Sequence, residues 1–172
     1  HDTAYYPIDP QGDSSMYCVD PSMHQEIVSL IATRKTLILA TRSPHDEFPE
    51  ASYTPFIDHQ ERFYILVSQL AKHTQHLADS RLCHVLFLED ESTAVNVFAR
   101  KRVSFRCVVH RVDRPADRAE LLLDQMQQKF GPTIGLLRGL GDFHLLELAP
   151  REGLFVRGFG QAFPITPTTQ NA

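Results

Sequence analysis

The chain has 172 residues, of which 42% are hydrophobic and 22% are charged. This length suits one domain with a single core, and the composition differs clearly from that of disordered, collagen-like or coiled-coil proteins. The 17 basic and 21 acidic side chains give a formal net charge of −4, which does not favour binding to nucleic acid. Every apolar run is far shorter than the ~20 residues that span a bilayer. We therefore expect neither a nucleic acid nor a membrane as a partner.

The three cysteines, Cys18, Cys83 and Cys107, are odd in number and form no CxxC motif. Cys83 and Cys107 lie within apolar runs. This pattern predicts buried, reduced thiols and a cytoplasmic protein rather than a disulfide-bonded secreted one.

The first half of the chain begins with residues 1–19, which are rich in Tyr, Pro, Asp and Ser and predict an N-terminal arm. Asp20 followed by Pro21 predicts the start of an amphipathic helix with an aliphatic inner face. Three strands are then expected over residues 36–42, 51–58 and 63–68. The last of these is apolar on both faces and is expected to be central, whereas Pro55 places the second at an edge or a bulge.

The second half alternates predicted helices and strands. Helices are expected over residues 71–80, 92–99 and 115–130, and strands over 83–89, 102–112, 142–148 and 153–159. Gly131 and Pro132 are expected to stop the third of these helices, with a turn-rich link after them.

Strands that pair mostly with their sequence neighbours, with helices between the later ones, predict a mainly β protein with helices (α+β). The expected architecture is an antiparallel β-barrel in one domain over residues 20–163, followed by a Pro/Thr-rich tail over 164–172.

One candidate site lies where the third strand ends in Ser68 and passes into a helical turn that carries Lys72, His73 and Thr74. Cations and hydroxyls beside the free N–H groups of a helix start favour an anion. The alternative is a solvated helix start. His73 and His76 have no third ligand that would complete a metal site, which favours two surface histidines.

A second candidate site is the basic run Arg100, Lys101 and Arg102, with Arg106 on the same strand face as Arg102. Such a cluster suits a phosphate or a carboxylate. The alternative is a solvated face that balances the acidic residues 89–91.

The Gly158 and Gly160 pair predicts a β-bulge, because no helix follows to make a dinucleotide-binding turn.

Five motifs occur in this order: ASYTPF (51–56), LAKHTQHL (70–77), EDESTA (89–94), FARKRVSF (98–105) and GLFVRGFGQAF (153–163). Together they resemble the HugZ/HutZ family of haem-utilisation proteins, within the pyridoxamine 5′-phosphate oxidase-like split β-barrel superfamily. The resemblance covers about residues 34–163 and implies a homodimeric split barrel with its ligand sites at the dimer interface.

The resemblance implies two kinds of ligand. In the flavin-binding branch, the positions of Ser68, Lys72, His73 and Arg102 hold the FMN phosphate and ring. In the haem branch the same region takes haem, with basic residues near the propionates and an iron-ligating histidine after the GFGQA motif.

We therefore expect a haem-binding protein of haem utilisation that degrades haem oxidatively. Lys72, Arg100, Lys101 and Arg102 would anchor anionic groups, and Tyr53 and Phe159 would pack on the macrocycle.

Two alternatives stay open. One is an FMN-dependent oxidoreductase, with Lys72, His73 and Thr74 on the phosphate and Ser52 and Tyr53 near the ring. The other is a non-enzymatic haem carrier or storage dimer.

The iron ligand is not identified by the motifs, because no histidine follows His144 in the sequence. His110 and His144 are the substitute candidates, and their spacing favours neither. We expect weak haem binding, or binding through a non-standard ligand, with little conversion of the haem.

Overall fold

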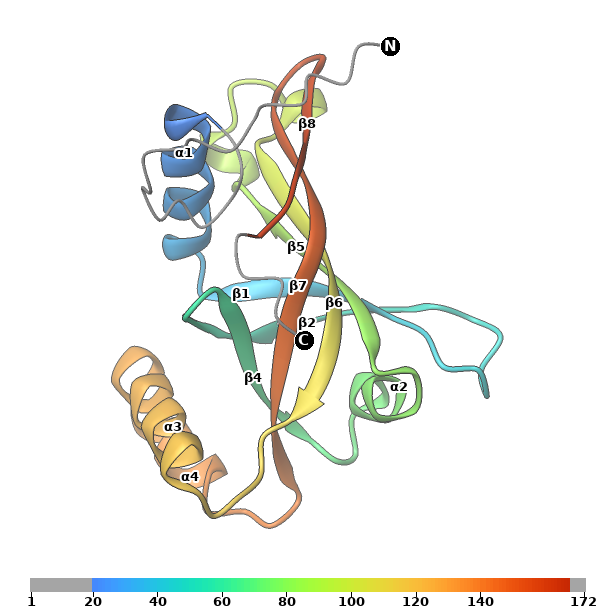
Figure 1. Cartoon of the computed structure of the whole chain (residues 1–172), viewed down its shortest axis with the longest axis vertical. Coiled ribbons are helices and arrows are strands. Elements are labelled where there is room, and N and C mark those ends of the chain that lie inside the picture. The colour runs from blue at the N-terminus through green and yellow to red at the C-terminus, as the bar shows by residue number, and fades with distance from the viewer. Residues whose placement is uncertain (1–19, 168–172) are drawn as a thin grey trace.

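The computed structural model describes residues 20–167 (Figure 1). The predicted N-terminal arm, Cys18 and the last five residues lie outside the described residues.

The first helix, α1, spans Pro21–Ala32 and begins as the sequence predicts. The Asp20 carboxylate accepts a hydrogen bond from the Ser22 backbone N–H at 2.7 Å, and proline occupies the first helical position, where its missing N–H costs nothing. The apolar stripe of this helix, Met23, Ile27, Leu30 and Ile31, is buried.

The described residues form one eight-stranded sheet in which every pairing is antiparallel. Its strands are β1 Thr36–Thr41, β2 Glu50–Pro55, β3 Ile57–His59, β4 Arg62–Ser68, β5 Leu82–Leu88, β6 Arg102–Arg111, β7 Phe143–Gly158 and β8 Gln161–Ile165. The other helices are α2 Lys72–Ser80, α3 Asp117–Phe130 and α4 Pro132–Leu137. The prediction of a mainly β fold with helices is confirmed.

The strand order is β2-β1-β5-β6-β7-β4-β3, with β8 paired to β7. The sheet therefore stays open between β2 and β3, although it curls enough for β2 to contact β4. Pro55 ends the edge strand β2, as predicted, and β4 has a partner on each side.

The prediction of two final strands is wrong, because residues 143–158 form one continuous strand, β7. A register shift opposite Arg106 and Cys107 absorbs the extra residue beside Pro150, so a stretch that looks like a turn remains in the sheet. The strand passes so close to β6 that a Cβ on Gly153 would lie 2.4 Å from the Ser104 carbonyl oxygen. Glycine is the residue that permits this approach.

The predicted bulge near Gly158 is confirmed by a register shift between Val156 and Gly158. Gly160, with φ of 70°, then makes the turn into β8. This last strand continues to Ile165, so the boundary predicted at residue 163 falls inside it.

Two other predicted helix boundaries are corrected. Pro132 does not lead into a link without helix: it opens α4 directly after Gly131, since proline is tolerated at a first helical position. The helix expected over 92–99 is two 3₁₀ turns, Glu91–Thr93 and Val97–Ala99.

The sheet has a separate apolar core on each face. One core packs α1 and α2 against the inner strand positions, and its largest buried side chains include Phe56, Phe63, Phe87 and Phe105. The other core packs α3 and α4 against Tyr64 and Leu145. Figure 1 shows α2 and the α3–α4 pair on opposite sides of the strands.

Within residues 20–167 no helix has both the length and the apolar character needed to cross a bilayer.

Candidate functional site

The structure brings four of the predicted site residues together where β2 and β4 meet the start of α2. The Ser52 hydroxyl lies 2.9 Å from Nδ1 of His73. The Thr74 hydroxyl donates to the Ser68 carbonyl at 2.6 Å, and the Ser68 hydroxyl accepts from the Leu70 backbone N–H at 3.2 Å. These polar groups therefore hydrogen-bond within the protein and stabilise the strand–helix junction.

Lys72 points from this junction to two carboxylates, Asp46 of the β1–β2 connection and Glu50 at the start of β2. Its Nζ lies 3.0 Å from Asp46 and 3.9 Å from Glu50. The hydrogen bond to Asp46, reinforced by its charge, raises the pKa of Lys72 above the ordinary value. The ammonium group is thus already paired in the single chain.

Burial is the main cause that lowers the pKa of His73 below its ordinary value, and the nearby Glu50 opposes this effect. At neutral pH the His73 imidazole is therefore uncharged, and it adds no cation to this junction.

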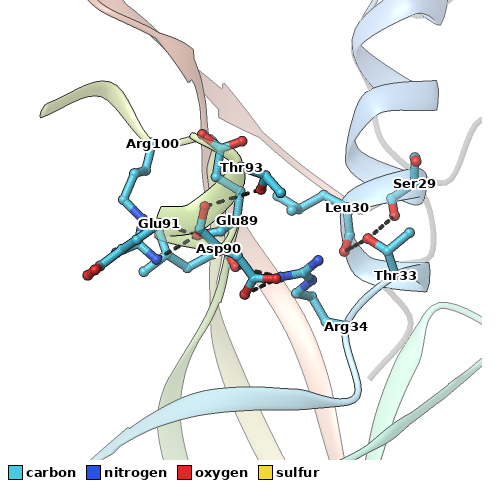
Figure 2. A network of polar contacts seen from close by, with 10 residues as sticks. Ser29, Leu30, Thr33, Arg34, Glu89, Asp90, Glu91, Thr93 and Arg100 are labelled. Atoms are coloured by element: carbon cyan, nitrogen blue, oxygen red, sulfur yellow. Dashed lines mark hydrogen bonds and ion pairs between the residues drawn. The ribbon is translucent and has the colours of Figure 1, made fainter. Parts of the chain in front are cut away.

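The second predicted cluster, Arg100 to Arg102, lies against acidic side chains. Arg100 donates from Nη2 and Nε to the Glu89 carbonyl at 2.6 and 3.1 Å, and its Nη1 lies 3.6 Å from Glu91 (Figure 2). Lys101 pairs with Glu26 of α1 at 3.2 Å. Of the three cations, only Arg100 therefore pairs with the acidic run of residues 89–91, and Arg102 makes no ion pair within residues 20–167.

A single chain holds the two clusters apart. Glu50, which lies near Lys72, is aligned through β1 with Cys83 of β5, whereas Arg102 is aligned with Leu88. Five residues of strand separate these positions, or about 17 Å.

The two predicted stacking aromatics are also apart. Tyr53 follows Ser52 in β2 and therefore projects from the face opposite α2, where it is 68% exposed. Phe159 lies in the β7–β8 hairpin at the Arg102 end of the sheet and is 77% exposed.

A cavity with a volume of about 740 Å³ lies between α2 and the adjoining ends of β6 and β7. Leu77, Val109 and Leu146 give it apolar walls. Arg81 and Arg111 also line it, and neither guanidinium is paired with a carboxylate within residues 20–167.

The two candidate iron ligands from the sequence, His110 and His144, line this cavity. His144 shares a sheet face with Leu146, whereas His110 is aligned with Glu147 on the opposite face. The His144 Nε2 lies 3.3 Å from the Gln69 side-chain carbonyl oxygen.

The family model described as pyridoxamine 5′-phosphate oxidase matches residues 23–157. The chain belongs to this family.

The chain is also similar in sequence to a protein whose activity is described. The protein described as heme oxygenase HutZ from Vibrio cholerae is 38% identical over 144 residues, which are 84% of this chain and 81% of that protein.

Two solved structures show the same fold at appreciable identity. The crystal structure of HutZ from Vibrio cholerae, described there as a heme storage protein, has a TM-score of 0.70 at 36% identity, covering 74% of this chain and 89% of that one. The crystal structure of Campylobacter jejuni ChuZ has a TM-score of 0.78 at 28% identity, covering 90% of this chain and 67% of that one.

The sequence analysis did not identify Gln69, Arg81 and Arg111 as residues of this cavity. Gln69 directly precedes the LAKHTQHL motif, but Arg81 follows the end of α2 and Arg111 is the last residue of β6, and neither shares a spacing with that motif.

It also missed the buried carboxylate of Glu147. This group accepts hydrogen bonds from Arg62 at 2.5 Å, from Tyr64 at 2.9 Å and from Arg118. Burial favours its protonated form, but the bonds from Arg118, Tyr64 and Arg62 outweigh burial, so the pKa of Glu147 lies below its ordinary value. This network ties α3 to β4 and β7.

Proposed function

We propose that the protein binds haem in haem utilisation, and that the cavity between α2, β6 and β7 holds the macrocycle. The observation that carries this proposal is that the cavity combines apolar walls, two guanidinium groups with no carboxylate partner among residues 20–167, and an imidazole in contact with Gln69. Its 38% identity to a protein described as a heme oxygenase supports the same ligand.

The size and lining of the cavity fit a large flat ligand. Its volume of about 740 Å³ is within the range of ligand sites, roughly 300 to 1,000 Å³. Leu77, Val109 and Leu146 would pack against the apolar macrocycle, which gains free energy when its surface leaves water.

The two arginines of the cavity would suit a ligand that carries carboxylate groups. Arg81 and Arg111 line it without a carboxylate partner among residues 20–167, and a guanidinium binds a carboxylate with charge-assisted hydrogen bonds. We assign the haem propionates to these two residues.

His144 is the better placed of the two candidate iron ligands. Its Nε2 lies 3.3 Å from the Gln69 side chain, and such a contact orients a ring as outer partners of metal-binding histidines do. The other ring nitrogen would then be available to iron. When bound, haem supplies the activation of O₂, while the chain supplies the ligand and the anchors.

FMN is the alternative ligand, carried by membership of the pyridoxamine 5′-phosphate oxidase family. Lys72, the cation expected on its phosphate, is paired with Asp46 and Glu50, and Thr74 donates to Ser68. The internal use of these groups favours haem over FMN.

We also propose that the protein is a cytoplasmic homodimer. Several exposed apolar residues gather near the Arg102 end of the sheet, namely Val95, Val97, Phe98 and Phe159. Burying them against a second copy would bring Arg102 to the subunit interface.

The free thiols of Cys83 and Cys107 suit a reducing compartment, which supports the cytoplasmic location.

Whether the bound haem is degraded or only carried separates two functions within this proposal, and HutZ from Vibrio cholerae is described both as a heme oxygenase and as a heme storage protein. Loss of the haem band under O₂ with a reductant would assign degradation, and a stable band would assign a carrier.

The site is tested by titrating haemin into the wild-type protein and into His144→Ala, with His110→Ala as the matched control. We expect His144→Ala to weaken affinity by about tenfold or more and to shift the haem absorption band, because it removes the ligand. His110→Ala should change neither. Equal behaviour of the two variants would overturn the assignment of His144.

A further inference from the structure

Two free cysteines lie opposite each other in the sheet and have no part in the proposed haem site. Cys83 of β5 and Cys107 of β6 are aligned partners, and both are buried, reduced thiols. Residues directly opposite in an antiparallel pair point to the same face, and both side chains belong to the same apolar core.

The hydrogen bonds at the two ends of this strand pair fix the spacing of the cysteines. The Val109 N–H donates to the Arg81 carbonyl at 2.9 Å, and the Glu89 N–H donates to the Lys101 carbonyl at 2.9 Å. Hydrogen-bonded pairs recur every second residue, so Cys83 and Cys107 form such a pair, with Cα atoms about 5.5 Å apart. Disulfides most often join Cα atoms about 5.5 to 6 Å apart.

The two thiols differ in their environment. Cys83 is 8% exposed and Cys107 is 1% exposed, and both residues line a surface cavity of about 550 Å³ near Ser80. Burial, followed by the hydrogen bond to Cys83, raises the pKa of the Cys107 thiol well above its ordinary value. A small oxidant therefore meets Cys83 first.

We propose that Cys83 and Cys107 are a peroxide-sensitive thiol pair that closes to a reversible disulfide within one chain. Cys83 attacks the peroxide, its thiol is oxidised to a sulfenic acid, and one water leaves. The Cys107 thiol then displaces the sulfenic oxygen as a second water, which forms the S–S bond. The peroxide is the two-electron oxidant, and the two thiols are the reductant.

The spacing also makes the bond easy to reduce. Opposite Cβ atoms in a sheet lie about 4.5 to 5.5 Å apart, whereas a disulfide needs about 3.5 to 4.5 Å. The strands must therefore approach each other to close the bond, and a dithiol reductant should reopen it.

The test uses the full chain with Cys18→Ser, so that Cys83 and Cys107 are the remaining cysteines. After treatment with hydrogen peroxide, intact mass spectrometry should show the loss of two hydrogen atoms, and thiol titration should show the loss of both thiols. Tryptic digestion without reductant should give residues 82–100 linked to residues 107–111. Dithiothreitol should restore both thiols.

Two single variants test the assigned roles. In Cys107→Ser the sulfenic acid on Cys83 should accumulate and be trapped by dimedone, because its partner is gone. In Cys83→Ser the buried Cys107 should stay a thiol under the same treatment.

The outcome that matters most comes from the protein with both core cysteines intact, so it does not depend on how the single variants fold. Retention of both thiols, addition of oxygen without the linked peptide, or a linkage that joins two chains on a non-reducing gel would each overturn the proposal.

Discussion

Single side chains decide which charges in this protein are available to a ligand. Lys72, Arg100 and Lys101 have the residue types that an anion site needs, but Asp46, Glu89 and Glu26 neutralise or occupy them. Arg81 and Arg111 belong to no motif in the sequence, yet they line an apolar cavity and have no carboxylate partner among the described residues 20–167. A basic residue therefore identifies a site only when its partners are known.

Glu147 gives a test of stability at this scale. Glu147 is 2% exposed, and replacing it by glutamine removes the charge that three donors share. We expect Glu147→Gln to lower the free energy of unfolding by about 1.5 to 3 kcal/mol at pH 7. Urea denaturation of both proteins measures this difference.

The control is Glu152→Gln, which removes the carboxylate of the exposed Arg106–Glu152 pair and should cost about 0 to 1 kcal/mol. Because the folded-state pKa of Glu147 is lowered from 4.5, its contribution is present above this pH and is lost as the pH falls through the folded value. The difference between wild type and Glu147→Gln should therefore shrink below about pH 4.5. Equal costs for the two variants at pH 7 would contradict this account.

At the scale of elements, β7 organises the fold. It pairs with β4, β6 and β8 along its length. Its second residue is His144, which lines the proposed site. Its length was hidden in the sequence because Pro150 and Gly153 are residues that usually mark turns. A bulge and a close strand approach explain both of them here.

Gly153 tests this close approach. A Cβ at this position would lie 2.4 Å from the Ser104 carbonyl oxygen and 2.7 Å from the Phe105 ring, so Gly153→Ala should destabilise the protein by about 1 to 3 kcal/mol. Gly158→Ala in the same strand is the matched control, because its Cβ would meet its nearest atom at 3.7 Å. Thermal unfolding that ranks the two variants equally would show that β6 and β7 are less close.

At the scale of the whole molecule, the sequence predicts the local elements but not the cavity. Residue periodicity identified α1, the central strands and α2, because each pattern is local. The cavity combines Gln69, Arg81, Arg111 and His144, which come together only through pairing of β4, β6 and β7. The separation of Lys72 from Arg102 likewise depends on strand register, which the sequence does not state.

The proposed dimer is a prediction about the same scale. If the exposed apolar residues near Arg102 form the interface, light scattering should report a dimer at micromolar concentration. The double variant Phe98→Ser with Phe159→Ser should be monomeric or dissociate more readily. Leu136→Ser, which changes an exposed apolar residue of α4, should leave the dimer intact. A monomeric wild-type protein would contradict the proposal.

The most direct test of the central claim is an absorption titration of the purified protein with haemin, with FMN titrated in parallel. We predict a Soret band that saturates with haemin at a defined stoichiometry, and no comparable change with FMN. A protein that leaves haemin unbound, or that binds FMN while rejecting haemin, would contradict the assignment of the cavity to haem.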